Sequence, residues 1–600
     1  MNHRPKTLLE NAYRQESPAR SLLRLLEGQR TAFLRMLAMN LVKSSPIWVM
    51  PICTANIINV ITYPERHESW ELWLNGAIVL AFLFQNLVTH VWFQRLLSTI
   101  LRNIEVNLRS ALVRRIQHLS LAFLDTTESG RLQSKVLRDV ENVQIFYSNL
   151  VVNVFISLAG LAVACGVTLS RRPAMVLFFL LIVPLCVFLV QHFRKPLAKV
   201  NRMYRLHMER MSSRVIEMLD MLPVTRAHGV EETEIARMDL RLASVRRSGL
   251  RVDVLNAIFG CSAWVTFNSF QVAFFLLCAW LAYHGDLQIL GWNLFPGRMP
   301  VGDVILYQSF FAMIVGNVNS ILNVYPMLTK GADSMRSIGE VLECPDIERN
   351  AGKRLVPKVA GGFRLEQLSY TYPGAAQPAL HDLDLEIPPG ECVAVIGGSG
   401  SGKSTLMSLL IGFRRPTAGR ILLDGQDMET LDLRQYRRFL AVVPQNTLLF
   451  KGTIRDNITY GLSDVTEAQL QAAVEMANCA EFIRQLPQGL DTPLGEHGGS
   501  LSGGQRQRLS IARAIIRDPR VIILDEATSA LDVAAEKQVQ EAIARLVEGR
   551  TTFIVAHRFS TIRIASRILV MKEGRCVEAG SAAELLARGG EFQRLHNLQA

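Results

Sequence analysis

Apolar residues are gathered into six long runs in the first half of the chain. The runs lie at residues 33–62, 72–94, 148–169, 174–193, 255–283 and 302–327. About 20 helical residues cross the hydrocarbon core of a bilayer, so each run predicts one membrane span. The first run is interrupted by polar and proline residues, which we expect to face other helices or water rather than lipid. These residues are Lys43, Pro46, Pro51, Asn56 and Asn59.

The pattern changes after residue 328. Short apolar runs, such as 392–396 and 521–524, alternate there with Gly, Pro and charged segments. This pattern is typical of a soluble α/β domain. The sequence therefore predicts an all-α six-helix transmembrane domain followed by an α/β domain. The expected boundaries are an N-terminal segment at 1–31, the membrane domain at 32–328, a linker at 329–361 and the α/β domain at 362–600.

Lysine and arginine set the expected orientation of the spans. Residues 1–31 carry six of them, and residues 194–251 carry 13 against seven acidic residues, so both segments are expected in the cytoplasm. Arg171 and Arg172 depart from this rule, because they lie on an expected outer turn. Six spans return the chain to the cytoplasm, where we expect the α/β domain.

Composition excludes several other classes of protein. The 600 residues are 49% hydrophobic and 20% charged, which excludes intrinsic disorder. The net charge of +12 is attributed to the inner face of a membrane protein rather than to nucleic-acid binding. The nine cysteines form no Cys-x-x-Cys pair and accompany no histidine cluster, so neither a disulfide framework nor a zinc site is expected. The polar N-terminus does not resemble a cleaved secretory signal.

Two long inner connections, at 95–147 and 194–254, have the pattern of charged, amphipathic helices that extend beyond the bilayer. Each has an irregular tip, at 123–130 and at 222–224. We expect a short turn that faces a soluble partner at each tip, and a plain helical hairpin is the alternative.

Residues 397–404 fit the phosphate-loop pattern G-x-x-x-x-G-K-[ST] between a predicted strand at 393–396 and a predicted helix. In such a loop, backbone N–H groups close around phosphate oxygens at a helix N-terminus. Lys403 is expected to reach the β- and γ-phosphates, and the Ser404 hydroxyl to coordinate Mg²⁺.

A second apolar strand, at 521–524, ends in two carboxylates. The carboxyl edge of an α/β sheet is where ligands bind. We expect Asp525 to hold the Mg²⁺ shell and Glu526 to orient or deprotonate the attacking water.

Residues 501–505, with the sequence LSGGQ, resemble the signature motif of ATP-binding cassette transporters. Other motifs follow the order of that family: Tyr372 as the adenine-stacking aromatic, Gln445 as the Q-loop, Asp532 in the D-loop and His557 as the switch histidine. The membrane half is similar to exporter-type half-transporters, with looser matches. Lys135 stands where that group usually has Arg, and His497 replaces a commoner Arg beside the retained Glu496.

The resemblance implies a set of site residues. It implies catalytic roles for Glu526, His557 and Gln445, and Mg²⁺ ligation by Ser404, Gln445 and Asp525. ATP is expected to be bound by Tyr372, Gly397, Gly398, Ser399, Gly400, Ser401, Gly402, Lys403, Ser404, Thr405, Ser502, Gly503, Gly504, Gln505 and Asp532. In the family, the helix that Ser502 opens meets the nucleotide of the opposite subunit, so a dimer is implied.

The resemblance implies an ATP-driven exporter or flippase, with two ATP molecules closing a dimer that alternates between inward- and outward-facing states. The expected partners are a second transporter subunit, membrane lipid and the transported substrate, with no nucleic acid, in a bacterial inner membrane. An importer with the exporter fold, for example for siderophores, is the alternative. A soluble cassette protein acting on DNA or ribosomes is disfavoured by the six apolar runs.

Two questions stay open at the level of sequence. The intact motifs mean that two copies of this chain could form two competent sites, but a heterodimer in which a related partner carries a degenerate site stays open. The many Asn and Gln side chains in the spans favour an amphiphilic or polar substrate, such as a peptide, glycolipid or metal chelate. Pairing of these amides between helices is the alternative explanation.

Overall fold

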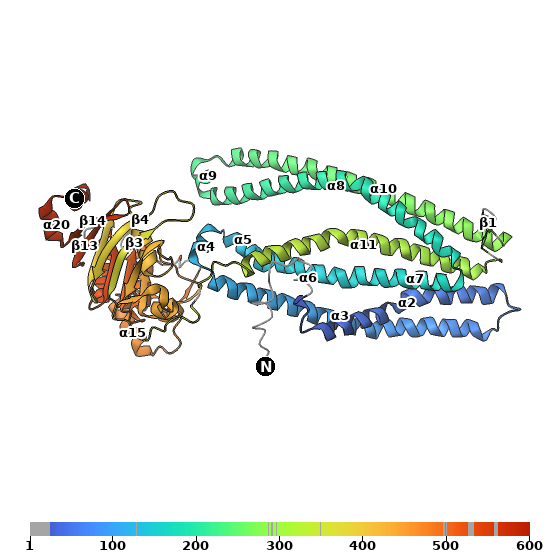
Figure 1. The fold of residues 1–600 in the computed structure, drawn as a ribbon, viewed down its shortest axis with the longest axis horizontal. Helices are drawn as coiled ribbons and strands as arrows, with labels where there is room; N and C mark the ends of the chain where they lie inside the picture. The colour runs from blue at the N-terminus through green and yellow to red at the C-terminus, as the bar shows by residue number, and fades with distance from the viewer. Residues whose placement is uncertain are drawn as a thin grey trace. The chain divides into compact units, whose positions relative to one another are not determined.

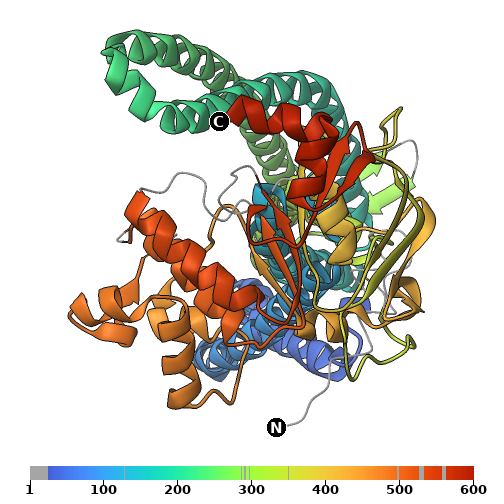
Figure 2. The same cartoon turned by 90° about the vertical axis from the view of Figure 1, so that its left-hand side faces the viewer.

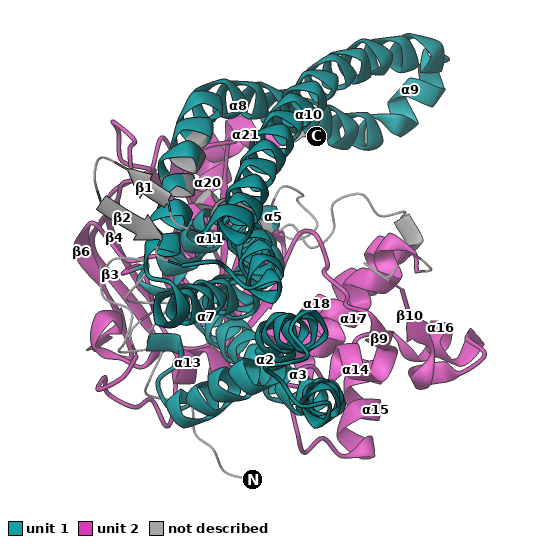
Figure 3. Cartoon of the chain, turned by 90° about the vertical axis from the view of Figure 1, so that its right-hand side faces the viewer, with its two compact units in different colours: residues 1–117, 129–344 teal, residues 118–128, 345–600 magenta. Residues whose placement is uncertain are grey.

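The computed structural model describes residues 24–599, except 128, 286, 290–291, 296, 349, 496–498, 500, 526–532 and 557–561. The chain forms two compact units (Figure 3). Unit 1 comprises Met1–Gln117 and Ser129–Cys344, and unit 2 comprises His118–Glu128 and Pro345–Ala600.

Unit 1 is helical apart from a short hairpin. Its helices are α2 (Arg30–Thr62), α3 (Trp70–His118), α5 (Ser129–Ser134), α6 (Val140–Asn149), α7 (Ile156–Arg171), α8 (Ala174–Asp220), α9 (Leu222–His228), α10 (Glu231–His284) and α11 (Val301–Leu342). The π-helical turns η1 (Lys135–Asp139) and η2 (Leu150–Phe155) join α5, α6 and α7, and the hairpin strands are β1 (Leu287–Ile289) and β2 (Trp292–Phe295).

The described residues include five helices that are long and apolar enough to cross a membrane. They are α2, α3, the stretch Gly130–Arg171, α10 and α11. The sixth predicted run, 174–193, lies within α8. The helical membrane domain predicted from the apolar runs is therefore present.

The polar residues of the first apolar run face other helices, as expected. They belong to one continuous helix, α2, which contains Pro46 and Pro51. The Asn56 side chain donates to Asn75 Oδ1 at 3.3 Å, and Asn59 Oδ1 accepts from the Gly302 N–H at 2.8 Å. Pairing between helices thus accounts for these two amides.

A polar cluster around the buried Asp303 joins the ends of α2, α7 and α11. Arg171 Nη1 lies 2.6 Å from Asp303 Oδ1, and its Nη2 donates to Asn56 Oδ1 at 3.3 Å. Arg172 donates to the carbonyls of Gly297 and Arg298, at 3.1 and 2.9 Å. Both arginines of the expected outer turn are therefore ion-paired or hydrogen-bonded while partly exposed, which explains how the turn tolerates them.

Helices α8 and α10 lie side by side as a long pair joined by α9 (Figure 1). The end of this pair that carries α9 stands apart from the other helices of unit 1 in two perpendicular views (Figures 1 and 2). The tip predicted at 222–224 is thus a short helix, with the Val224 side chain 43% exposed. The tip predicted at 123–130 contains the short helix α4 (Leu121–Thr126).

Unit 2 contains two main sheets. The six-stranded sheet has the order β14-β13-β5-β12-β11-β8, and it is parallel except for β14. Its strands are β5 (Cys392–Gly397), β8 (Leu440–Val443), β11 (Val521–Asp525), β12 (Thr551–Val555), β13 (Arg567–Lys572) and β14 (Arg575–Gly580). An antiparallel sheet has the order β4-β3-β6-β7, with β3 (Phe363–Tyr370), β4 (Leu380–Ile387), β6 (Ala418–Leu423) and β7 (Gln426–Asp427).

Helices flank these sheets, and a small two-stranded sheet completes the unit. The helices are α12 (Lys403–Leu410), α13 (Leu433–Tyr436), α14 (Ile454–Ile458), α15 (Glu467–Met476), α16 (Ala480–Gln485), α17 (Gly503–Ile515), α18 (Val533–Val547), α20 (Ala582–Arg588) and α21 (Glu591–Gln599). The short strands β9 (Gly452–Thr453) and β10 (Pro493–Leu494) pair with each other, and 3-10 turns lie at Met428–Thr430, Arg437–Phe439 and Gly489–Asp491.

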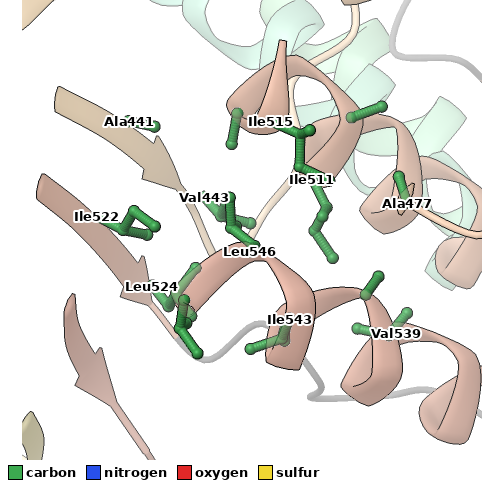
Figure 4. Packing of buried hydrophobic residues seen from close by; sticks show 14 of the residues in the cluster. Ala441, Val443, Ala477, Ile511, Ile515, Ile522, Leu524, Val539, Ile543 and Leu546 are labelled. Atoms are coloured by element: carbon green, nitrogen blue, oxygen red, sulfur yellow. The ribbon is translucent and has the colours of Figure 1, made fainter. Parts of the chain in front are cut away.

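Strand β11 shows why this sheet forms. Its residues are apolar at four successive positions because both faces of a parallel sheet are covered. Ile522 and Leu524 belong to one buried cluster with residues of α17 and α18 (Figure 4). Val521 and Ile523 belong to a second cluster that includes residues of α12 and of the antiparallel sheet. The α/β domain predicted after residue 328 is therefore present.

The residues before α4 are tied to the segment that leads into the α/β domain. The Ser120 N–H donates to the Asp346 carbonyl, and the Glu348 N–H donates to the His118 carbonyl, both at 2.9 Å. Leu119 and Ile347 form an antiparallel β-bridge between these bonds. This pairing explains why residues 118–128 cluster with unit 2.

Candidate functional site

Parallel pairing brings the main sequence motifs to one edge of the six-stranded sheet. In the register, Asp525 is level with Val555, Val555 with Val395, and Leu524 with Val443. The ends of β5, β11, β12 and β8 therefore share one edge. From this edge the chain continues into loop 397–404, Asp525, residue 557 and Gln445, respectively.

The phosphate loop depends on two glycines. Gly402 caps α12 with φ of +99°, and a Cβ there would lie 2.6 Å from Leu380 Cδ2 and 2.8 Å from the Ala379 carbonyl. A Cβ on Gly397 would lie 2.1 Å from the Met571 carbonyl. Any other residue would be strained in this left-handed conformation and would also collide with its neighbours.

Lys403 lies folded over its own loop. Its side chain is 7% exposed, and Nζ donates to the carbonyls of Gly397 and Gly398, both at 2.9 Å. Ser401 Oγ is buried and has no hydrogen-bond partner in the described part of the chain. Gly398, Ser399, Gly400 and Ser404 are exposed, so the loop presents backbone groups, a hydroxyl and a nearby ammonium to a ligand.

Tyr372 is held beside this loop at the start of α12. Its hydroxyl lies 3.0 Å from Thr405 Oγ1, and the Arg414 guanidinium lies over its ring at 4.7 Å from the centroid. Tyr370 packs against it edge-on at 5.1 Å between centroids. The ring remains 37% exposed, whereas Thr405 is buried and already bonded to Tyr372. Sequence reasoning missed Arg414, because no motif identifies an arginine that stacks from a later loop.

The signature segment opens α17. Ser502 is the N-cap, and its Oγ accepts from the Gln505 N–H at 3.3 Å while Gln505 Oε1 accepts from the Ser502 N–H at 2.9 Å. This reciprocal pair is a capping box, which fixes the first turn of the helix. Ser502 and Gly503 are exposed and Gly504 is buried. In the described structure, no hydrogen bond of Ser502 or Gln505 reaches residues 397–405.

Helix α17 also fastens the segment that follows Gln445. Thr447 Oγ1 donates to Gln507 Oε1 at 2.8 Å. Arg513 donates from Nη1 to the Leu448 carbonyl at 3.0 Å and from Nε to the Asn457 carbonyl at 2.8 Å. Burial lowers the pKa of Arg513 from its usual range, with a smaller contribution from Arg517. Sequence reasoning missed these residues, because arginine on an amphipathic helix is typical of a solvated face.

Several expected site residues lie outside the described residues. They are Glu526, Asp532 and His557, together with Glu496 and His497. Asp525 is described as the half-buried last residue of β11. Gln445 is exposed just beyond β8. The described site therefore comprises the phosphate loop, Tyr372, Asp525, Gln445 and the start of α17.

Comparisons with known proteins match both halves of the chain. Residues 380–529 match the ABC transporter family, and residues 40–318 match the ABC transporter transmembrane region. An ATP-dependent lipid A-core flippase of Chromobacterium violaceum is 34% identical over 529 residues, which is 88% of each chain. A protein of the same name from Chromohalobacter salexigens is 35% identical over 508 residues, covering 84% of this chain and 85% of the relative.

A solved structure shows the same fold over nearly the whole length. It is the structure of a bacterial Atm1-family ABC exporter with ATP bound, with a TM-score of 0.80 and 24% sequence identity. The alignment covers 95% of this chain and 98% of that chain.

Proposed function

The chain belongs to the ATP-binding cassette transporter family as a half-transporter with fused membrane and ATPase domains, and we propose that it flips or exports an amphiphilic substrate as a homodimer. It is a multi-pass membrane protein and an ATP-dependent translocase. Half-transporters of this family function as dimers. The observation that carries the proposal is the shared edge of the six-stranded sheet, where the phosphate loop, Asp525 and Gln445 follow neighbouring strands.

The residues at this edge fit a magnesium ion. Mg²⁺ prefers oxygen ligands and is commonly bound by one or two carboxylates together with substrate phosphates. The exposed Ser404 hydroxyl, the Asp525 carboxylate and the Gln445 amide oxygen supply such donors. When bound, the ion would offset the negative charge of the phosphates.

The chain's own residues have distinct roles in this proposal. Lys403 leaves the carbonyls of Gly397 and Gly398 and pairs with phosphate oxygens, which are stronger acceptors because they are charged. The exposed face of Tyr372 stacks on adenine. Glu526 orients the attacking water and accepts its proton, and His557 donates to the γ-phosphate.

The exposed start of α17 explains why two copies are needed. Ser502 and the N–H groups of Gly503 and Gly504 form a helix N-terminus, which favours an anion. Among the described residues, none of their hydrogen bonds reaches the phosphate loop of the same chain, so we propose that they contact the ATP bound by the partner subunit. Mixing Ser502→Arg chains with Lys403→Ala chains tests this. In a mixed dimer one site carries both lesions and the other carries neither, so ATPase should partly recover, whereas no recovery after verified subunit exchange contradicts shared sites.

An amphiphilic substrate is supported by polar atoms that the helices leave unpaired. Gln308 Oε1 and Asn317 Nδ2, both on α11, are buried and have no hydrogen-bond partner in the described structure. Unpaired polar atoms are costly inside an apolar bundle. Polar groups of a substrate would form hydrogen bonds with them. Two of the similar proteins are lipid A-core flippases, which agrees with a lipid-like substrate.

The test is lipid movement in proteoliposomes whose ATPase domains face outward. A fluorescent glycolipid in the outer leaflet should become protected from dithionite when ATP is added, since the outer leaflet then corresponds to the cytoplasmic one. Glu526→Gln should bind ATP but lose this movement and nearly all hydrolysis, because a positioned base contributes about 10²–10⁴-fold. Movement in the opposite direction would favour an importer, and no ATP-dependent movement of any tested amphiphile would overturn the proposal.

A further inference from the structure

The chain passes between its two compact units at three points. These points are residues 117–118, 128–129 and 344–345. Within unit 2, the bridge between Leu119 and Ile347 ties the first point to the third. Within unit 1, Arg115 Nη2 donates to the Cys344 carbonyl at 2.6 Å and ties the same two points again. The second point follows α4, so the bonds made by the residues after it decide whether α4 is joined to the other two points.

Lys135 on η1 ties this second point to the end of α11. Its side chain is only 5% exposed. Its Nζ donates to the Ser337 carbonyl at 2.5 Å, to Ser337 Oγ at 2.8 Å and to Glu340 Oε2 at 2.8 Å. An ammonium has three N–H donors, so every donor of Lys135 is used. The hydrogen bond from Lys135 lowers the pKa of Glu340 below its usual range, with smaller contributions from the charges of Lys135 and Arg131.

The contact continues along α11 toward the membrane. Helix α11 runs beside η1 and α6 (Figure 1). Ser334 Oγ donates to Asp139 Oδ1 at 3.1 Å and accepts from Asn142 Nδ2 at 3.0 Å. A Cβ on Gly331 would lie 2.5 Å from a side-chain carbon of α6, so the helices are in close contact there. The contact covers residues 331–340, about 14 Å along a helix that continues into the last apolar run.

We propose that Lys135 is a positioning residue for ATP-driven switching, because it makes the chain that follows α4 and the end of α11 move as one body. All three points at which the chain passes between the units are then joined. Without Lys135, a movement of α4 would be lost in the turn η1 instead of reaching the last span. The turn itself is π-helical, a geometry that is frequent at functional sites. The inference goes beyond the proposed function, since it concerns switching and does not depend on the substrate.

The test compares four variants of the full-length protein in lipid nanodiscs. Lys135→Met removes the ammonium but fills its space, and Lys135→Arg keeps the charge. Glu340→Gln weakens the same contact at a side chain that is 54% exposed, so it is unlikely to disturb folding. Arg138→Met is the matched control, because Arg138 lies on the same turn, is exposed, and bonds only locally, to Ser134 Oγ at 3.2 Å. ATPase, melting temperature and backbone hydrogen–deuterium exchange are measured, the exchange with and without ATP.

In the wild type, ATP should raise exchange at residues 63–69, the turn between α2 and α3 that is expected on the outer side. Lys135→Met should reduce this response about fivefold, the size of effect typical for a residue that carries coupling. Its ATPase should stay close to the wild-type rate, because the ATP site lies in unit 2, while exchange at residues 331–342 rises. Glu340→Gln should change the response in the same direction by less. Lys135→Arg and Arg138→Met should behave like the wild type.

Two results would overturn the proposal. Equal loss of ATPase and of the ATP response in Lys135→Met, with a lower melting temperature and no rescue by Lys135→Arg, would assign Lys135 to packing alone. An unchanged ATP response together with faster exchange at residues 331–342 would show that the contact opens without affecting switching. If Lys135→Met does not fold, Glu340→Gln decides by the same two criteria.

Discussion

At the scale of single residues, two features define the phosphate loop: glycines in a left-handed backbone conformation, and a lysine that already forms hydrogen bonds within the loop. Lys403 is held by two carbonyls of its own loop, so phosphate binding replaces existing hydrogen bonds instead of capturing a free ammonium. This arrangement keeps the loop in shape before ATP arrives. The loop geometry should therefore matter as much as the charge.

The change Gly402→Ala tests that geometry. Gly402 has φ of +99° with two neighbours under 3.0 Å from an added Cβ. A non-glycine residue in the left-handed region costs about 1–2 kcal/mol before any collision. We expect a lower apparent melting temperature without nucleotide, and ATP affinity at least tenfold weaker.

Gly398→Ala is the matched control for stability. Its added Cβ meets nothing within 4 Å, and its φ lies outside the left-handed region. Its melting temperature should equal that of the wild type. Equal destabilisation by both changes would show that the loop responds to any added methyl group, contrary to the role given to Gly402.

Sequence and structure agree at this scale where a residue acts through its own local chemistry. The pattern at 397–404 predicts a phosphate loop, and the structure places that loop between β5 and α12. The partners that come from distant segments were not predictable. The stacking of Arg414 on Tyr372 and the hydrogen bond from Arg513 to the Leu448 carbonyl both depend on tertiary packing. No local sequence pattern specifies that packing.

At the scale of elements, α17 links two parts of the site. Its first turn carries the signature residues, and its middle and end hold the segment that follows Gln445 through Gln507 and Arg513. We therefore expect a movement of one part to be transmitted along this helix to the other. The capping box at Ser502 was readable from the sequence, because Ser-x-x-Gln is its usual pattern.

Arg513→Ala tests this link. The change leaves the carbonyls of Leu448 and Asn457 without their charged donor, and at the buried Asn457 an unpaired acceptor costs about 1–3 kcal/mol. We expect a lower apparent melting temperature and ATPase reduced several-fold, with ATP affinity maintained because the phosphate loop is untouched.

Arg513→Lys is the informative companion. Lysine keeps the charge but cannot make several bonds in the fixed geometry of a guanidinium. Its ATPase should fall close to that of the alanine variant. Full activity in the lysine variant would mean that charge alone matters, and the mechanical link through α17 would be refuted.

The helices also show where the sequence pattern fails to predict the ends of an element. The apolar runs fall within long helices, but α8 and α10 continue far beyond the apolar residues, to Asp220 and back to Glu231. Their charged extensions are helical because they contain few breakers and pair with each other. The charge pattern predicts the extensions, whereas the short helix α9 at their tip depends on how the two helices meet.

At the scale of the whole molecule, the sequence predicts a helical membrane domain followed by an α/β ATPase domain, and both are present. It also predicts a tip at 123–130 that faces a soluble partner, but it does not predict the bridge through which residues 118–128 join unit 2. That grouping depends on the bridge between Leu119 and Ile347, which are far apart in the chain. Pairing at such a separation is specified by the fold and not by any neighbouring residues.

A transporter must also transmit ATP-driven movement to its spans, and we expect the tip at α9 to take part. Replacing Pro223 and Val224 with Gly loosens this helix without adding charge. Transport should fall much more than ATPase, because hydrolysis depends on residues of unit 2. Both activities are measured in the same proteoliposomes, with a distance probe across the outer gate.

Equal loss of both activities with a lower melting temperature would indicate general unfolding of this variant. Normal opening of the outer gate would show that α9 is not a transmission element. The intermediate result, hydrolysis without opening, is the one that transmission through α9 requires.

The ion pair between Arg171 and Asp303 also dictates an order of events during biosynthesis. The ribosome delivers Arg171 and Arg172 to the membrane well before it makes Asp303, so the expected outer turn between α7 and α8 inserts before the carboxylate that pairs with Arg171 has been made. Cationic residues resist translocation. The orientation of the spans must therefore be set by the more numerous basic residues on the cytoplasmic side. The Arg171–Asp303 ion pair forms only when the last span has inserted. Asp303 thus neutralises a segment synthesised long before it, and a chain truncated ahead of this residue would lack the carboxylate that pairs with Arg171.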